Sequence, residues 1–369
     1  MKFAYLDATR LQKQIYYADI NNPRGSFELI WNWLPNNSNT VDECSKLLST
    51  IIEKYEILRT TLVEENGVIK QKIAESFSRA QISGINQSSE YFSPSLLKSI
   101  SAKSHGCCFI LQHDNSNLVH SIYGVANHSI IDAASIEYLR VELCQLSLNV
   151  CVDDIADELQ FADIVHSLDS LEHDWTNLDD SEYNDEYANS IHSICLDANR
   201  DKSVVWYSSD NPFSLISSSA HYSLHLTTLA QFFSHLISKI GLFLNKPFLK
   251  VGVALDARNF IDIGRMIGPA LLVRKGCVDI SKLSSLSKSN ELNNFLYESK
   301  ITTDSSSLFS QTTNYEVLFN LIIHQPSDLN YLDVFATSEY CNDSGANVPI
   351  TIDCSFDVSL SRFNLFLRS

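Results

Sequence analysis

Basic residues are scarce in this sequence. Its 369 residues include 27 Lys and Arg against 44 Asp and Glu, which gives a formal net charge of −17 at pH 7. A surface of this sign repels the phosphate backbone of nucleic acids, and no dense cluster of Lys and Arg offsets it. The composition therefore argues against nucleic-acid binding.

Long apolar runs and paired cysteines are also missing. No stretch approaches the roughly 18 uninterrupted apolar residues of a membrane span, and the N-terminal "MKFAYLDATRLQKQ" has no signal-peptide core. None of the nine cysteines forms a CxxC pair, the spacing typical of zinc sites and disulfide scaffolds. We therefore expect a cytoplasmic protein with buried free thiols and no metal.

Helical and strand patterns alternate along the chain. Hydrophobic residues make up 44% of the sequence, as in folded globular proteins. Apolar periodicity and turn residues predict an α+β fold. The predicted helices cover 9–19, 40–55, 131–146 and 223–244. The predicted strands cover 26–33, 56–65, 68–73, 107–113, 118–126, 249–255, 270–279, 315–324 and 349–358.

Short motifs define some of these elements more closely. Thr40 and Glu43 have the spacing of a capping box before an apolar helical face. Asn66-Gly67 is a typical hairpin turn. Residues 167–190 hold many acids and no Lys or Arg, which predicts a linker or surface crossover.

The stretch "ANHSIIDAAS" at 126–135 is the most informative for chemistry. It places His128 four residues before Asp132, after an apolar strand and before a helix. Taken alone, such a histidine is more often an ordinary loop or core residue. Ser129 could be considered as a nucleophile, but adjacent side chains rarely face each other as a Ser–His pair requires. Cys107-Cys108 lies in a predicted strand and fits a core position better than a nucleophile.

Several stretches resemble, in the same order, the sequence blocks of nonribosomal peptide synthetase condensation domains. Around the His128 motif, which resembles His-His-x-x-x-Asp-Gly, these stretches are "LQKQIYY" (11–17), "EKYEILRTTLVEENGVIKQKI" (53–73), "FAD" (161–163), "KVGVALDARNF" (250–260), "MIGPALLVRK" (266–275) and "NYEVLFNL" (314–321). Each block is weak by itself, but their order strengthens the resemblance.

This resemblance implies a V-shaped pseudo-dimer of two chloramphenicol-acetyltransferase-like lobes within a monomer. We place the N-terminal lobe at 1–165, an acidic linker at 166–200 and the C-terminal lobe at 201–369. In the family, the reaction site lies in a tunnel between the lobes. Carrier proteins deliver substrates there on phosphopantetheine arms, and neither a bound cofactor nor a metal is implied.

The same resemblance assigns candidate site residues. His128 takes the place of the reactive histidine, and Asp132 that of an aspartate paired with an arginine. Arg59 and Arg258 are the candidate partners, with Arg258 favoured. The remaining candidates are Asn127 and Ala133, which replace the first histidine and the glycine of the motif, and Ser129, Gly268 and Arg274, which are weaker candidates for the tunnel lining.

These residues predict a stand-alone acyltransferase that joins a carrier-bound acyl or aminoacyl thioester to an amine, with carrier proteins supplied in trans. An alcohol acceptor, which would give an ester, stays open. Asn127, Ala133 and a C-terminus that is short for the family leave a third alternative, a catalytically degenerate recruitment platform. The donor, the acceptor and the final metabolite are not specified by these residues.

Overall fold

The computed structural model describes residues 2–21, 27–35, 39–86, 106–148, 159–176, 204–209, 233–259 except 235, 239 and 243, 263–283, 309–310, 316–324, 335–342, 350–357 and 362–368. The chain divides into two compact units. Unit 1 comprises Met1–Asp169, Asp262–Ala270 and Ser327–Ala346. Unit 2 comprises Ser170–Ile261, Leu271–Pro326 and Asn347–Ser369. Unit 1 thus includes two stretches of the segment 201–369 that the sequence analysis assigned to the C-terminal lobe.

A five-stranded sheet forms the centre of unit 1, in the order β13-β2-β7-β6-β5. The β5–β6 pair is parallel and the other pairs are antiparallel. The strands are β2 (Glu28–Pro35), β5 (Ile82–Asn86), β6 (Cys107–His113), β7 (Val119–Asn127) and β13 (Phe335–Asn342). The predicted hairpin of 107–126 is confirmed as β6 and β7, while β5 and β13 were not predicted.

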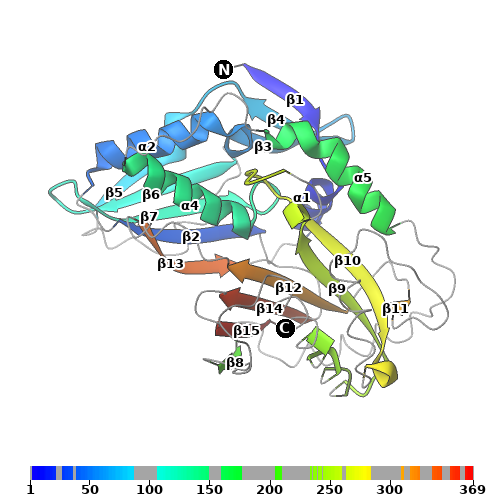
Figure 1. Ribbon diagram of the computed structural model, residues 1–369. Coiled ribbons are helices and arrows are strands. Elements are labelled where there is room, and N and C mark those ends of the chain that lie inside the picture. Colours follow the sequence, from blue (N-terminus) through cyan, green and yellow to red (C-terminus); the bar gives the residue numbers. More distant parts are fainter. Residues whose placement is uncertain are drawn as a thin grey trace. The chain divides into compact units, whose positions relative to one another are not determined.

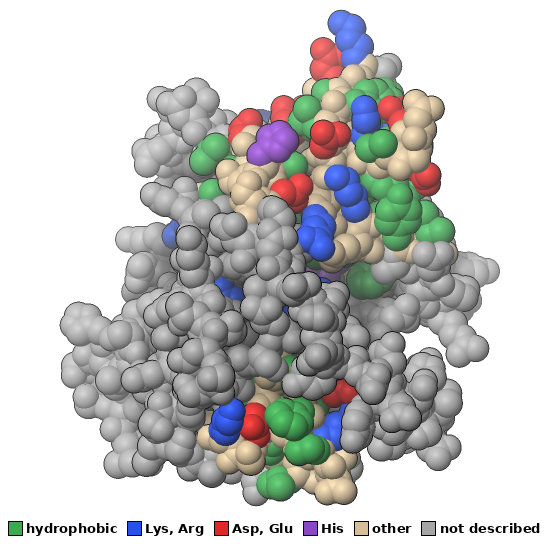
Figure 2. All heavy atoms as spheres, turned by 90° about the vertical axis from the view of Figure 1, so that its right-hand side faces the viewer, with side chains coloured by type: hydrophobic (Ala, Val, Ile, Leu, Met, Phe, Trp, Pro, Cys, Tyr) green, Lys and Arg blue, Asp and Glu red, His purple; other side chains and the backbone are tan. Residues whose placement is uncertain are grey.

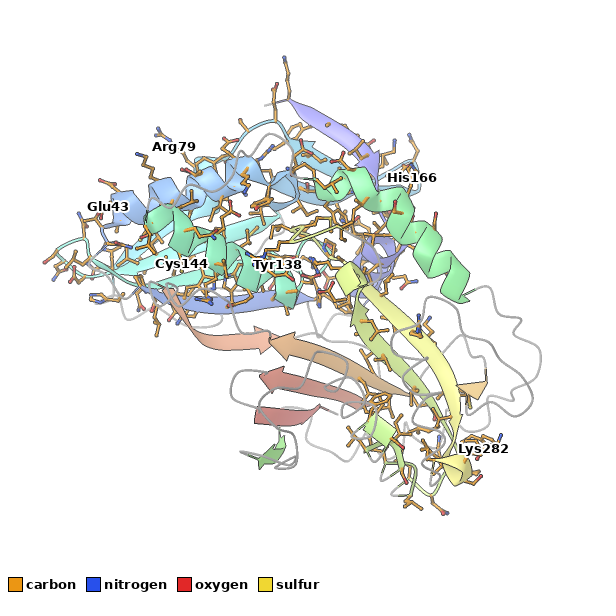
Figure 3. The ribbon with its side chains drawn as sticks, in the orientation of Figure 1. Glu43, Arg79, Tyr138, Cys144, His166 and Lys282 are labelled. Atoms are coloured by element: carbon orange, nitrogen blue, oxygen red, sulfur yellow. The ribbon has the colours of Figure 1, made fainter. Side chains whose placement is uncertain are left out.

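Two helices, α2 (Val41–Lys54) and α4 (Ala133–Ser147), lie side by side over one face of this sheet (Figure 1). The predicted capping box begins α2: the Thr40 hydroxyl accepts from the Glu43 N–H at 3.3 Å, and the Thr40 N–H donates to the Glu43 carboxylate at 2.8 Å. Figure 3 shows Glu43 at this end of α2, with Tyr138 and Cys144 on α4. The buried stripe of α2 consists of Cys44, Leu48, Ile51 and Ile52.

An aromatic cluster fills the core beside β2. Trp31 and Trp33 are nearly inaccessible, and each ring lies 5.9 Å from the Phe109 ring of β6. Gly124 of β7 leaves room for Trp31, since a Cβ at that glycine would lie 2.0 Å from the Trp31 Cε2 atom. Shape fitting of this kind fixes the register of β7 against β2.

A second, three-stranded sheet of unit 1 has the order β1-β4-β3. It comprises β1 (Phe3–Asp7), β3 (Thr60–Glu65) and β4 (Val68–Ala74). The predicted Asn66-Gly67 turn joins β3 to β4, with φ angles of 53° and 79° that suit a type I′ hairpin. Glu56–Arg59, expected as the start of a strand, instead forms a 3-10 turn, η1.

Four further described helical segments belong to unit 1 wholly or in part. They are α1 (Arg10–Asn21), the 3-10 turns η2 (Arg79–Gln81) and η4 (Phe161–Ile164), and α5 (Val165–Thr176), which continues past Asp169 into unit 2. The predicted acidic linker therefore begins in a helix. Its residues 177–200 lie outside the described residues, so the domain boundaries stay a prediction.

Unit 2 contains a seven-stranded sheet in the order β11-β10-β9-β12-β14-β15-β8. Strand β12 runs parallel to both of its neighbours, and the other pairs are antiparallel. Its strands are β8 (Val204–Ser209), β9 (Phe248–Asp256), β10 (Leu271–Asp279), β11 (Phe309–Ser310), β12 (Val317–His324), β14 (Ile350–Asp357) and β15 (Arg362–Arg368). The four strands predicted between 249 and 358 are confirmed here.

One helical segment and two short 3-10 turns complete the described part of unit 2. The turns are η6 (Ala257–Asn259) and η7 (Ile280–Lys282). The described positions of 233–242 are helical, and Phe233 packs against Phe319 of β12 with ring centroids 4.4 Å apart. The rest of the helix predicted at 223–244 lies largely outside the described residues.

The thiols behave as the sequence predicted wherever their side chains are described. Burial raises the pKa of the Cys44 thiol to about 12 and that of Cys108 to about 11. The free, buried cysteines are Cys44, Cys107, Cys108, Cys144 and Cys277. The other four cysteines fall outside this description.

Charged side chains of both signs are interspersed over the described surface in Figure 2, without a large patch of one sign on the face shown. Among the helices within the described ranges, none combines the length and the apolar character required to cross a membrane.

Candidate active site

The His128 motif occupies the connection between β7 and α4. The main-chain N–H of His128 donates to the Phe27 carbonyl at 2.6 Å. The N–H groups of Ile130 and Ile131 both donate to the Asn127 carbonyl, at 2.8 and 3.3 Å, and close a tight turn. The predicted order of strand, histidine loop and helix is confirmed.

The ring of His128 is held in one orientation by its own loop. Its Nδ1 atom lies 3.1 Å from the carbonyl oxygen of Ile131. A carbonyl oxygen can only accept, so Nδ1 must carry the hydrogen. In the neutral ring, Nε2 then keeps its lone pair, and no described residue hydrogen-bonds to this nitrogen.

The surroundings of His128 favour the neutral ring. Burial lowers the pKa of His128 below its ordinary value, and this effect outweighs the opposing influence of the Asp132 carboxylate and of the nearby main-chain groups. Although the residue retains some exposed surface, protein atoms surround the ring. At neutral pH, His128 is therefore an uncharged imidazole with an available Nε2 lone pair.

Residues on both sides of His128 fix the loop. The Asn127 amide donates to the Asp19 carboxylate and accepts from the Ser129 N–H, each at 2.9 Å. The amide of Gln12, a fully buried residue of α1, donates to the Ser129 carbonyl at 3.0 Å. Within the described part of the chain, no hydrogen bond joins the Ser129 hydroxyl to His128, so the geometry does not form a Ser–His pair.

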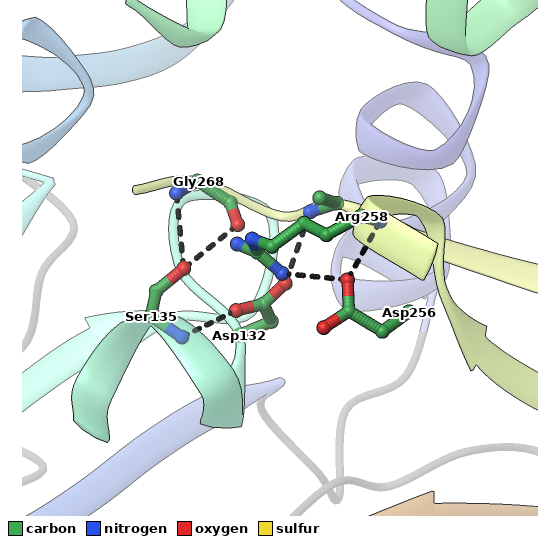
Figure 4. Close-up of polar contacts among 6 residues, drawn as sticks. Asp132, Ser135, Asp256, Arg258 and Gly268 are labelled. Atoms are coloured by element: carbon green, nitrogen blue, oxygen red, sulfur yellow. Dashed lines mark hydrogen bonds and ion pairs between the residues drawn. The ribbon is translucent and has the colours of Figure 1, made fainter. Parts of the chain in front are cut away.

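Asp132 caps α4 and is 2% exposed. One carboxylate oxygen accepts from the Ser135 N–H at 2.8 Å and the other accepts from the Ala270 N–H at 3.0 Å. The Ser135 hydroxyl both donates to the Gly268 carbonyl and accepts from the Gly268 N–H, at 3.0 Å each (Figure 4). Asp132 and Ser135 therefore bind the main chain of 268–270 to the first turn of α4.

Gly268 also contacts the "FAD" stretch at 161–163, another of the stretches that resemble family blocks. Its φ angle is 152°, and a Cβ at this position would lie 2.3 Å from the Cδ2 atom of Phe161. Three stretches that resemble family blocks, around His128, Phe161 and Gly268, thus meet within unit 1. Ala133, the first residue of α4, has no positive φ, so its methyl group causes no backbone strain there.

The predicted arginines fall in three different environments. Arg59, the less favoured of the two candidate partners of Asp132, does not pair with it. Its guanidinium donates to the carbonyls of Ile52 and Glu53, at 3.0 Å each, and to that of Ala74. The first two belong to the last turn of α2, where free carbonyls and the helix dipole attract a cation.

Arg258 and Arg274 belong to unit 2. Arg258 forms an ion pair with Asp256 at 2.9 Å (Figure 4), and its pairing with Asp132 stays a prediction. Arg274 lies in β10 and is 1% exposed, so it is not a surface residue. The predicted contribution of Arg274 to a tunnel is untested.

Sequence reasoning missed Asp19, Ser135 and the role of Gln12. The spacing from Asp132 to Ser135 is that of a helix cap and its third residue, so that contact had a local signal. Asp19 had none, because its partner Asn127 is 108 positions away. Within the described ranges, no group of three or more His, Cys, Asp or Glu side chains is arranged to hold a metal ion.

Comparison with known proteins assigns the fold of the chain to a structural class. No protein-family model matches the chain, and no curated protein matches its sequence. Solved structures, in contrast, match the fold of the chain. The epimerization domain from the third module of tyrocidine synthetase B is 12% identical with a TM-score of 0.63, and the match covers 100% of this chain and 92% of that one.

Two condensation domains match this chain about as well as the epimerization domain does. That of the Monacolin K polyketide synthase MokA has a TM-score of 0.64 at 12% identity, with 99% of this chain and 92% of that chain covered. The starter condensation domain of rhizomide synthetase, a point mutant in complex with C8-CoA, has a TM-score of 0.64 at 10% identity, with 99% and 89% covered. The chain therefore has the condensation-domain fold, an α+β fold of the chloramphenicol-acetyltransferase-like type.

Proposed function

We propose that the protein is a condensation-type acyltransferase that transfers an acyl or aminoacyl group from a carrier-bound phosphopantetheinyl thioester to an amine. One observation supports this most strongly. On a fold shared with condensation domains, the His128 loop holds a neutral imidazole. Its Nδ1 donates to the Ile131 carbonyl, and its Nε2 accepts no hydrogen bond from any described residue, which leaves its lone pair available for a proton. The C8-CoA complex of the rhizomide synthetase domain adds that a related fold accommodates an acyl thioester.

The proposed chemistry uses that lone pair. The amine nitrogen attacks the thioester carbonyl carbon and forms the C–N bond, while a proton of the amine passes to His128 Nε2. The C–S bond then breaks and the thiolate leaves, with the imidazolium as the nearest source of a proton. An amine with an ordinary pKa near 8 is partly neutral already, so orienting the amine by a hydrogen bond to Nε2 is as important as removing its proton.

A low imidazole pKa fits this role. A ring that stays neutral is available as an acceptor over the whole neutral range, although it is a weaker base than a free imidazole. Asp132 takes no direct part in this scheme, because both of its oxygens accept main-chain N–H groups. We assign Asp132 to holding the loop and α4 in place.

Delivery of the acyl group completes the proposal. We propose that carrier proteins supply it in trans and that their phosphopantetheine arms, rather than a resident cofactor, bring the thioester to His128. An alcohol acceptor would react by the same steps and give an ester. The amide is preferred because a neutral amine is nucleophilic before it loses its proton, whereas an alcohol depends on removal of its proton by a base, and His128 is a weak one.

The test is acyl transfer by the purified chain. An acyl-loaded carrier protein is incubated with a panel of amines and alcohols, and products are identified by mass spectrometry. We expect amide product from the wild type and at least a roughly 100-fold loss in His128→Ala, the scale of a general acid–base contribution. His166→Ala is the matched control, since His166 is an exposed residue of α5 (Figure 3), and it should keep wild-type activity.

Each other outcome has a defined meaning. If only ester products form, the acceptor is an alcohol and the proposed amine acceptor is wrong. Equal background from wild type and His128→Ala, with carrier binding intact, would overturn catalysis and support the recruitment platform. Product formation that survives His128→Ala at the wild-type rate would overturn the assignment of His128.

A further inference from the structure

Asp19 and the His128 loop are linked in a closed ring of hydrogen bonds. One Asp19 oxygen accepts from the Asn127 amide at 2.9 Å, and the other accepts from the Phe27 N–H at 3.0 Å. The Phe27 carbonyl in turn accepts from the His128 N–H at 2.6 Å. Since Asn127 and His128 are neighbours in sequence, the ring closes on the histidine itself.

The donor and acceptor pattern of this ring leaves little choice of side chain. Asn127 donates on one side, to Asp19, and accepts on the other, from the Ser129 N–H at 2.9 Å. Asp19 faces two donors, and its carboxylate presents a separate oxygen to each. Asn127, which differs from the histidine expected by family resemblance, therefore matches a carboxylate on α1.

We propose that Asp19 is a positioning residue for His128. It holds Asn127 on one side of the histidine and, through Phe27, the main chain of the histidine itself. The orientation of the imidazole, with Nδ1 on the Ile131 carbonyl, then depends on a residue of α1. The effect on catalysis rests on the proposed function, whereas the effect on the orientation of the imidazole does not.

Exchanging the two side chains is a sharp test. In Asp19→Asn, an amide that keeps its oxygen toward the Phe27 N–H presents its NH₂ to the NH₂ of Asn127, so two donors face each other. In Asn127→Asp, two carboxylates face each other. In the double variant, the amide now at position 19 accepts from the Phe27 N–H and donates to the carboxylate now at position 127. That carboxylate also accepts from the Ser129 N–H, so each hydrogen bond of the wild-type arrangement has a counterpart in the double variant.

The first readout is independent of turnover. Nitrogen-15 NMR of the histidine rings reports which nitrogen of His128 carries the hydrogen, with His128→Gln identifying the signal. We expect the Nδ1–H form to dominate in the wild type and in the double variant, and a mixture of forms in each single variant. Glu65→Gln, which removes one exposed negative charge from the β3–β4 hairpin, controls for net charge and should leave the ring signals unchanged.

The second readout is acyl transfer. We expect kcat to fall about tenfold in each single variant, the effect of losing one well-formed hydrogen bond, and to return to within about threefold of wild type in the double variant. The double variant should also show a higher apparent pKa in its pH–rate profile, because the carboxylate has moved next to His128.

Two results would overturn the proposal. One is wild-type ring signals in both single variants. The other is a folded double variant whose ring signals are no closer to wild type than those of either single variant. If the ring signals follow the expected pattern while no variant transfers an acyl group, the positioning role stands and the proposed function fails.

Discussion

Gly268 and Phe161 lie so close together that no larger residue fits at position 268. A Cβ there would lie 2.3 Å from the Phe161 ring, at a φ angle of 152°. We expect Gly268→Ala to lower the free energy of unfolding by about 3 kcal/mol, since overpacking costs roughly 1–3 kcal/mol and the strained backbone adds more. Urea denaturation measures this loss.

Gly264→Ala is the matched control. Gly264 also has a positive φ, of 56°, but nothing lies within 4 Å of the added methyl group. Only the backbone cost of about 1 kcal/mol should appear. Equal losses in the two variants would show that contact with Phe161 is not what requires glycine at position 268.

Asp132→Asn tests whether both carboxylate oxygens are needed. The carboxylate accepts from the Ser135 and Ala270 N–H groups, whereas an amide has a single acceptor oxygen, so one buried N–H must face an NH₂ group. We expect a loss of about 1–3 kcal/mol in the free energy of unfolding. Asp163 is an exposed residue of η4 whose carboxylate accepts from the Gln160 N–H. In Asp163→Asn, the loss should stay within about 1 kcal/mol. The requirement for two acceptors would be refuted if Asp132→Asn were as stable as the wild type.

The lowered pKa of His128 predicts a loss of stability in acid. Because the pKa in the folded protein lies below the ordinary value, the unfolded chain binds more protons in the window between the two values. Stability should therefore be unaffected above pH 7 and fall as the pH decreases through about 6.5 and below. Urea unfolding at pH 7.5 and 5.5 should show a larger acid loss for the wild type than for His128→Gln. A smaller loss for the wild type would contradict the direction of the shift.

Buried thiols should resist alkylation. With the pKa of Cys44 near 12 and that of Cys108 near 11, almost no thiolate is present at pH 8. We expect iodoacetamide to leave Cys44, Cys107, Cys108, Cys144 and Cys277 unmodified in the native protein and to modify all five in urea, as read by peptide mass spectrometry. Rapid labelling of Cys44 or Cys108 without denaturant would show that these side chains are accessible.

Local signals in the sequence were sufficient for much of the fold. The Thr40–Glu43 capping box and the Asn66-Gly67 turn depend only on neighbouring residues, and both form as predicted. The histidine loop was found in the same way, since a strand, a polar pair and a helix follow one another. Four of the seven described strands of unit 2 were predicted, because apolar runs such as that of β9 are buried at most positions.

Contacts made by the main chain were not predictable in this way. The partners of Arg59 are carbonyl groups, which every residue carries, so no pattern of side chains marks them. The Ile131 carbonyl that orients His128 is likewise a main-chain group, so no side-chain pattern in the sequence predicts this contact. Strand β1 was missed because all five of its residues are exposed, so it lacks the alternation by which a half-buried strand is recognised.

Strand β13 has a consequence for how the protein is made. It pairs with β2 across about 300 positions of sequence, since Phe335 lies opposite Pro35. During synthesis, the ribosome must therefore add about 300 residues after β2 before the described sheet of unit 1 acquires β13. Until then β2 is an open edge that can recruit a strand from another molecule. A premature stop between Asn127 and Phe335 would leave that edge permanently bare and favour aggregation, even though the histidine loop had already been synthesised.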